Sequence, residues 1–91
     1  MPLSASEAKA AFLEFGKDTQ KIANDLYKVV KRPVPPEQKE AAVSAGRKKL
    51  QAYDDLLSAV SETWKTEAAD RFGHHIDSIR EFLAKASDGP A

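Results

Sequence analysis

Residues 31–36 read Lys-Arg-Pro-Val-Pro-Pro. Three prolines in six positions interrupt a helix, because proline lacks a backbone N–H donor and the residue before a proline avoids the α-helical region. We therefore predict a turn here. Since the turn is short, the helix that follows it should run back along the helix that precedes it. Pro36 can serve as the first residue of this second helix, with Glu37 and Glu40 in its first turns.

The segment before the turn has the pattern of one amphipathic helix. Residues 4–7 read Ser-Ala-Ser-Glu, a capping box that predicts a helix start at Ala5. One stripe then follows at steps of three and four residues, formed by Ala8, Phe12, Phe15, Thr19, Ile22, Leu26 and Val29. Gly16 interrupts this helix of residues 5–31 at a cost of about 1 kcal/mol relative to Ala. Either a close approach of another helix or a local weakness explains a glycine there.

A second stripe follows the turn and consists of Val43, Gly46, Leu50, Tyr53, Leu57, Val60 and Trp64. We predict a helix over residues 36–59 and a break near Ser58–Ser61, with Ser61 as the candidate N-cap. A third helix is expected over residues 62–71. Gly73 is expected to close it in the left-handed conformation, and a last helix should span residues 74–86, before a frayed tail at residues 87–91.

These elements predict an all-α fold, an antiparallel up-down helical bundle in a single domain of residues 1–91. It has four helices, or three if the second helix is continuous. A chain of 91 residues has no room for a second core. The predicted core is formed by Phe12, Phe15, Ile22, Leu26, Val43, Leu50, Tyr53, Leu57, Val60, Trp64, Ile76, Ile79 and Phe82.

The charges balance in total, with 14 basic and 14 acidic residues. They are uneven along the chain, because residues 1–49 hold ten basic and six acidic residues, whereas residues 50–91 hold four and eight. Such a dipole can orient a protein on a charged partner. The overall balance argues against nucleic acid as that partner, because nucleic-acid-binding domains are usually basic.

The sequence lacks the constellations on which most enzymes depend. It contains no cysteine, which removes disulfides, thiol nucleophiles and the commonest zinc sites. It also has no glycine-rich phosphate loop and no nucleophile elbow. The adjacent pair Asp54-Asp55 points in directions about 100° apart on a helix, so its carboxylates do not converge. His74 and His75 are the only histidines. We predict no enzyme activity and no catalytic, cofactor or metal site.

The basic residues are the best candidates for a binding surface. Three lie near the end of the first helix and three in the second helix, namely Lys28, Lys31, Arg32, Arg47, Lys48 and Lys49. Folding back of the second helix would bring several of them together as a positive end. Residues 47–49 span most of a helical turn, so not all three can face one partner. The alternatives are an ordinary solvated face and a surface that docks onto an acidic protein.

One spacing resembles a known family. The first helix reads Asp18-Thr19 and then Leu26, and the second reads Arg47 and then Tyr53. Over residues 15–53 this resembles the small lumenal extrinsic and assembly proteins of photosystem II, which are four-helix up-down bundles. The resemblance implies a non-catalytic extrinsic subunit or assembly factor that docks on the lumenal side of photosystem II and supports the oxygen-evolving complex. It implies a place in the thylakoid lumen, peripheral to the membrane, and no bound cofactor.

The ends of the chain bear on this assignment. Residues 1–15 lack the apolar region of a signal peptide, and the apolar runs are shorter than a membrane span. The chain is therefore expected to be a mature lumenal form or otherwise a cytoplasmic protein. The region after Tyr53 is shorter than in the assembly family, and the lipid-bearing N-terminal cysteine of bacterial members is missing. The alternative function is a soluble helical adaptor or self-associating interaction domain unrelated to photosynthesis.

Overall fold

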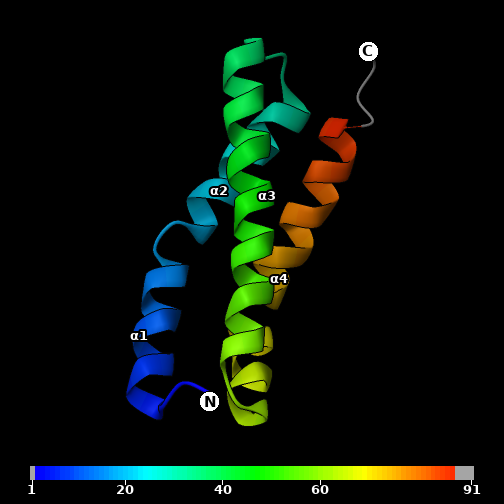
Figure 1. Cartoon of the computed structure of the whole chain (residues 1–91). Helices are drawn as coiled ribbons and strands as arrows, with labels where there is room; N and C mark the ends of the chain where they lie inside the picture. The colour runs from blue at the N-terminus through cyan, green and yellow to red at the C-terminus, as the bar shows by residue number, and fades with distance from the viewer. Residues whose placement is uncertain (1, 88–91) are drawn as a thin grey trace.

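The computed structural model describes residues 2–87, which form helices α1 (Ala5–Gly16), α2 (Thr19–Lys31), α3 (Pro36–Ala59) and α4 (Glu62–Ser87) and no strand. In Figure 1, α1 and α2 follow one another along one side, α3 returns along the whole length and α4 runs up again. The bundle measures 45 × 18 × 18 Å. This arrangement confirms the predicted all-α antiparallel bundle. None of the described helices is both long enough and apolar enough to cross a membrane.

The first helix begins as the capping box predicts. The Glu7 N–H donates to Ser4 Oγ at 3.3 Å, and the Ser4 N–H donates to the Glu7 carboxylate at 3.0 Å. The second hydrogen bond favours the charged carboxylate and lowers the pKa of Glu7. Just upstream, the Leu3 N–H donates to the Ala59 carbonyl at 2.9 Å. The start of the chain is therefore tied to the end of α3.

The predicted single helix over residues 5–31 is wrong, because the chain leaves the helix at Lys17 and Asp18. The Phe15 carbonyl accepts hydrogen bonds from Thr19 Oγ1 at 2.7 Å and from the Lys49 ammonium. These side-chain donors compete with the regular backbone bond. Gly16 ends α1 beside α4, and a Cβ atom there would lie 3.3 Å from the Phe72 ring. A close helix approach therefore accounts for the glycine.

The middle of the chain matches the prediction more closely. Helix α3 spans the predicted residues and has Pro36 in its first turn. The predicted break near Ser58–Ser61 is confirmed, because α3 ends at Ala59, Val60 is extended and α4 begins at Glu62. Connections of four and two residues make α3 antiparallel to both α2 and α4, which run parallel to each other.

The predicted division of the last segment into helices 62–71 and 74–86 is wrong. Gly73 is not left-handed, and α4 continues through it to Ser87. The buried residues of α4 form one unbroken stripe on both sides of this glycine, so packing outweighs its low helix propensity. They include Ala68, Phe72, Ile76, Ile79 and Leu83. The predicted frayed tail starts one residue too early at Ser87, and residues 88–91 lie outside the described residues.

Most of the predicted core is buried, but α3 is turned about its axis. Eight predicted residues are buried, namely Phe12, Phe15, Ile22, Leu26, Tyr53, Val60, Ile76 and Ile79. The other five are only partly buried and pack around them, namely Val43, Leu50, Leu57, Trp64 and Phe82. On α3 the buried positions include Lys49 and Leu56, which take the central places predicted for Leu50 and Leu57.

An aromatic cluster holds α1 against α3 and α4. The Phe15 ring lies 4.7 Å from the Phe72 ring and 5.9 Å from the Tyr53 ring, measured between centroids. The Phe12 ring meets Trp64 edge-on at 5.5 Å. Edge-on aromatic pairs stabilise a fold by about 0.5–1.5 kcal/mol beyond the area they bury. These aromatic contacts therefore attach the short α1 to α3 and α4 independently of α2.

Two helical glycines offer a matched test of this packing. A Cβ atom at Gly46 would lie 2.8 Å from Leu26 Cδ1 and 3.1 Å from Leu83 Cδ2, whereas one at Gly73 would meet nothing within 4 Å. We expect Gly46→Ala to lower the free energy of unfolding by about 1–2 kcal/mol, because overpacking outweighs the gain in helix propensity. Gly73→Ala should raise it by about 0.5–1 kcal/mol.

Urea denaturation followed by circular dichroism measures both effects. Two stabilising substitutions would contradict the close approach of α2, α3 and α4 at Gly46. Two destabilising ones would contradict the continuous α4.

Candidate functional site

Basic side chains from three helices gather at the end of the bundle where α2 turns into α3. A shallow hollow of about 370 Å³ there is lined by Val29, Val30, Lys31, Arg32, Pro33, Lys39, Lys85 and Ala86. A neighbouring hollow of about 280 Å³ is lined by Asn24, Tyr27, Lys28, Lys31 and Arg32. We define the basic end as Lys28, Lys31, Arg32, Lys39 and Lys85. The structure thus brings together Lys28, Lys31 and Arg32, three of the six predicted docking residues.

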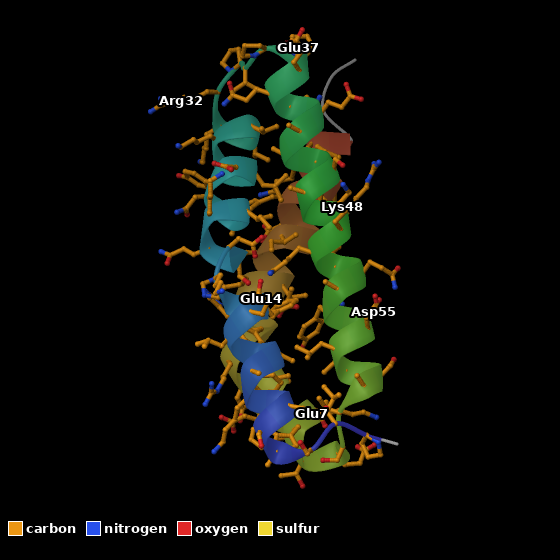
Figure 2. The ribbon with its side chains drawn as sticks, turned by 60° about the vertical axis from the view of Figure 1, so that its left-hand side comes forward. Glu7, Glu14, Arg32, Glu37, Lys48 and Asp55 are labelled. Carbon is orange, nitrogen blue, oxygen red and sulfur yellow. The ribbon has the colours of Figure 1, made fainter. Side chains whose placement is uncertain are left out.

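Most of the charge at the basic end is left uncompensated. Lys85 pairs with Glu81 at 3.2 Å, but none of the other four cations forms an ion pair with a carboxylate among residues 2–87. Glu37 lies at the same end as Arg32 (Figure 2), as does the start of α3 that carries Glu40. The surface is therefore positive in its hollows and has carboxylates nearby.

The predicted docking set did not include Lys85, nor Tyr27, whose ring lies beside these cations. Lys85 lies in the last turn of α4, and an up-running last helix ends at the α2–α3 turn. The up-down order of the predicted helices was therefore enough to place Lys85 at the basic end.

Arg47 and Lys48 lie farther along α3 and on different sides of it. Arg47 lines a hollow together with Lys39 and Ala86, so it borders the basic end. Lys48 instead lines the groove between α2 and α3, near Asp18 and Ala52. Figure 2 shows Lys48 well below Arg32 along the bundle. The prediction that residues 47–49 cannot all face one partner is therefore confirmed.

Lys49 is a correction to the predicted docking set, because its side chain is only 7% exposed. Its ammonium donates to the Phe15 carbonyl and, at 2.6 Å, to Asp18 Oδ1. It also lies 3.9 Å from the centroid of the Phe15 ring. The break between α1 and α2 leaves the buried Phe15 carbonyl without its regular helical donor, and Lys49 and Thr19 both donate to it. The Lys49 side chain has no surface to offer a partner.

The level of the Asp18–Lys49 pair divides the bundle into two ends of opposite charge. The end with the α2–α3 turn, residues 19–48 and 74–87, carries nine basic and five acidic residues. The other end, residues 2–17 and 50–73, carries four basic and seven acidic residues. The charge asymmetry of the sequence is thus also an asymmetry along the bundle. The exception is α1, which belongs to the basic half of the sequence but lies at the acidic end of the bundle.

The other titratable residues form no reactive cluster among residues 2–87. No group of three His, Cys, Asp or Glu side chains there is placed to hold a metal ion. Asp70 and His74 share the continuous α4, and the His74 and His75 rings lie 5.9 Å apart between centroids. Burial raises the pKa of Tyr53, so its phenol stays protonated at neutral pH. The binding surface is the stronger candidate.

Comparison with known proteins adds no family. No family model matches the chain, and no significant similarity was found to curated proteins or to solved structures. Of the residues that carry the resemblance to the photosystem II proteins, Thr19, Leu26 and Tyr53 are buried. Asp18 holds Lys49, and Arg47 is exposed beside the basic end. Four of these five residues therefore take part in the packing of this bundle.

Lys49 and its neighbour Lys48 provide a matched pair for testing the buried ammonium. We expect Lys49→Met to lower the free energy of unfolding by about 1–3 kcal/mol, because the Phe15 carbonyl and Asp18 lose a charged donor. Lys48→Met removes the same charge from an exposed site and should change stability by less than about 0.5 kcal/mol. Urea denaturation of both variants measures the difference. Equal effects would contradict the structural role of Lys49.

Proposed function

We propose that this chain is a non-catalytic docking subunit that binds an acidic surface of a protein partner through its basic end. One observation carries the proposal: four cations from three helices and Arg32 from the α2–α3 connection converge at one end of the bundle. Four of these five cations have no carboxylate partner among the described residues. Exposed cations gathered in this way are complementary to carboxylates on the surface of another protein.

The lengthwise charge asymmetry adds direction to this docking. An approaching acidic surface attracts the basic end and repels the other end, so the chain is turned before contact. Charges at the rim of an interface act mainly on the association rate, and salt screens them over a distance of about 10 Å at 0.1 M. Binding through the basic end should therefore weaken steeply as salt is raised.

In its narrower form, the proposal is that the partner is photosystem II. The chain would then be an extrinsic subunit or assembly factor on the lumenal side, present in the thylakoid lumen as a mature form and supporting the oxygen-evolving complex. The spacing of Asp18-Thr19, Leu26, Arg47 and Tyr53 and the up-down bundle support this form. No part of it requires a cofactor on this chain.

The test is a pull-down of the tagged chain from detergent-solubilised thylakoid membranes at low and moderate salt. We expect photosystem II core subunits to be retained at low salt and released at moderate salt. The double variant Lys31→Glu/Arg32→Glu should retain none, because it turns two attractive charges into repulsive ones. The matched control Lys9→Glu/Lys65→Glu makes the same change of net charge at the opposite end and should bind like the unchanged chain.

Three results would count against the proposal in different ways. If no photosynthetic protein is retained, the photosystem assignment is wrong, and the same variants are compared in soluble extract. If the basic-end variant binds as well as the unchanged chain, the docking surface lies elsewhere. If both double variants lose binding equally, net charge rather than the basic end controls it.

A self-associating adaptor is the second candidate, and the observation that favours it is Leu13. This side chain on α1 is 72% exposed, the most exposed large apolar residue among those described. An exposed aliphatic residue can pair with the same patch on a second copy.

Sedimentation equilibrium over a wide range of concentration separates the two candidates. The docking proposal expects a monomer throughout, because its partner is a different protein. A concentration-dependent dimer that disappears in Leu13→Glu would favour the self-associating adaptor. An unchanged dimer in that variant would place the contact away from Leu13.

A further inference from the structure

Tyr27 of α2 is 48% exposed, and no other large aromatic residue among those described is exposed to this extent. Its position shares one face of the helix with Asn24, Lys28 and Lys31, since Tyr27, Lys28 and Lys31 follow Asn24 by three, four and seven residues. All four side chains line the same hollow, which Arg32 closes at the end of the helix. The ring therefore shares its hollow with three cations and an amide.

The ring is held in place from behind. Phe82 of α4 meets it edge-on, with centroids 5.8 Å apart and planes at 65°. The Lys31 ammonium lies 5.6 Å from the same centroid. A ring fixed by these contacts loses little conformational freedom when a partner covers it. Tyrosine and arginine are also the residue types that most often dominate the energy of protein interfaces.

The charges around Tyr27 restrict the class of partner. Lys28, Lys31 and Arg32 call for anionic groups next to the ring. Glu37 and Glu40 lie at the same end of the bundle, and the chain carries no net charge. An extended anionic surface, such as a nucleic acid or an acidic membrane, would meet these carboxylates as well as the cations. A short acidic protein segment can fit the cations alone.

We propose that Tyr27 anchors the docking surface: an acidic protein segment lies across Tyr27, Lys28, Lys31 and Arg32, with an apolar or aromatic side chain against the tyrosine ring and carboxylates on the cations. This inference rests on the proposed function, since it names the contact through which the basic end binds. Docking by charge requires only acidic residues on the partner. The anchor also requires an apolar group between them.

The test uses two synthetic peptides of equal length and charge added to the whole chain labelled with ¹⁵N. Both are glutamate-rich, and one has a central tryptophan where the other has serine. Amide shifts measured by NMR give the site and the dissociation constant. We expect the shifts to centre on residues 24–32 and the tryptophan peptide to bind about threefold to tenfold more tightly, the range that an aromatic contact supplies.

Variants separate the ring from the charges. Tyr27→Ser should remove the preference for the tryptophan peptide, and Tyr27→Phe should keep it, because the phenyl face is retained. Leu13→Ser is the matched control, since it removes the other exposed large apolar side chain of residues 2–87 and should leave the preference unchanged. Lys31→Gln/Arg32→Gln should weaken both peptides alike, because it acts on the charge that the peptides share.

This experiment distinguishes a failure of the Tyr27 anchor from a failure of docking through the basic end. If both peptides bind equally and Tyr27→Ser changes neither, the anchor is overturned while docking by charge stands. If neither peptide binds at low salt, both proposals are overturned. If phosphatidylglycerol vesicles shift residues 24–32 and the peptides do not, the surface is a lipid-binding one and the protein segment is wrong.

Discussion

The arrangement of the first three helices depends on the contacts of the buried Lys49 ammonium. It joins the Phe15 carbonyl at the end of α1 to Asp18 at the start of α2 and rests on the Phe15 ring. A buried charge is costly unless acceptors surround it, and here a carbonyl, a carboxylate and an aromatic face do so. Because Lys49 belongs to α3, the same contact fixes how α3 is turned against the first two helices.

That turn of α3 determines which charges reach the surface. With Lys49 inside, Arg47 and Lys48 diverge, and only Arg47 borders the basic end. The basic end is then built where three helices meet, from the end of α2, the start of α3 and the last turn of α4. A run of three cations in the sequence thus contributes one residue beside the docking surface, whereas Lys85, far away in the sequence, contributes directly.

The sequence predicted the features that local chemistry controls. The Ser4–Glu7 capping box, the turn at residues 31–36 and the break at Val60 depend on residues close together in the chain. Gly16 was predicted inside a helix and Gly73 at a helix end, and the structure has the reverse, because distant contacts decide between the two. Lys49 was missed for the same reason, because its acceptors lie 31 and 34 residues away. The positive end was predicted, but its membership depends on packing.

The basic end and Tyr27 would serve different stages of one encounter. Exposed cations act at long range, where they speed and orient an approach, but contacts at the rim of an interface add little to its lifetime. Differences in lifetime between related complexes come mainly from dissociation, which the well-packed anchors of an interface slow. A half-exposed ring backed by Phe82 and bordered by cations has both properties in one hollow. Salt should therefore act chiefly on association, and the loss of the ring chiefly on dissociation.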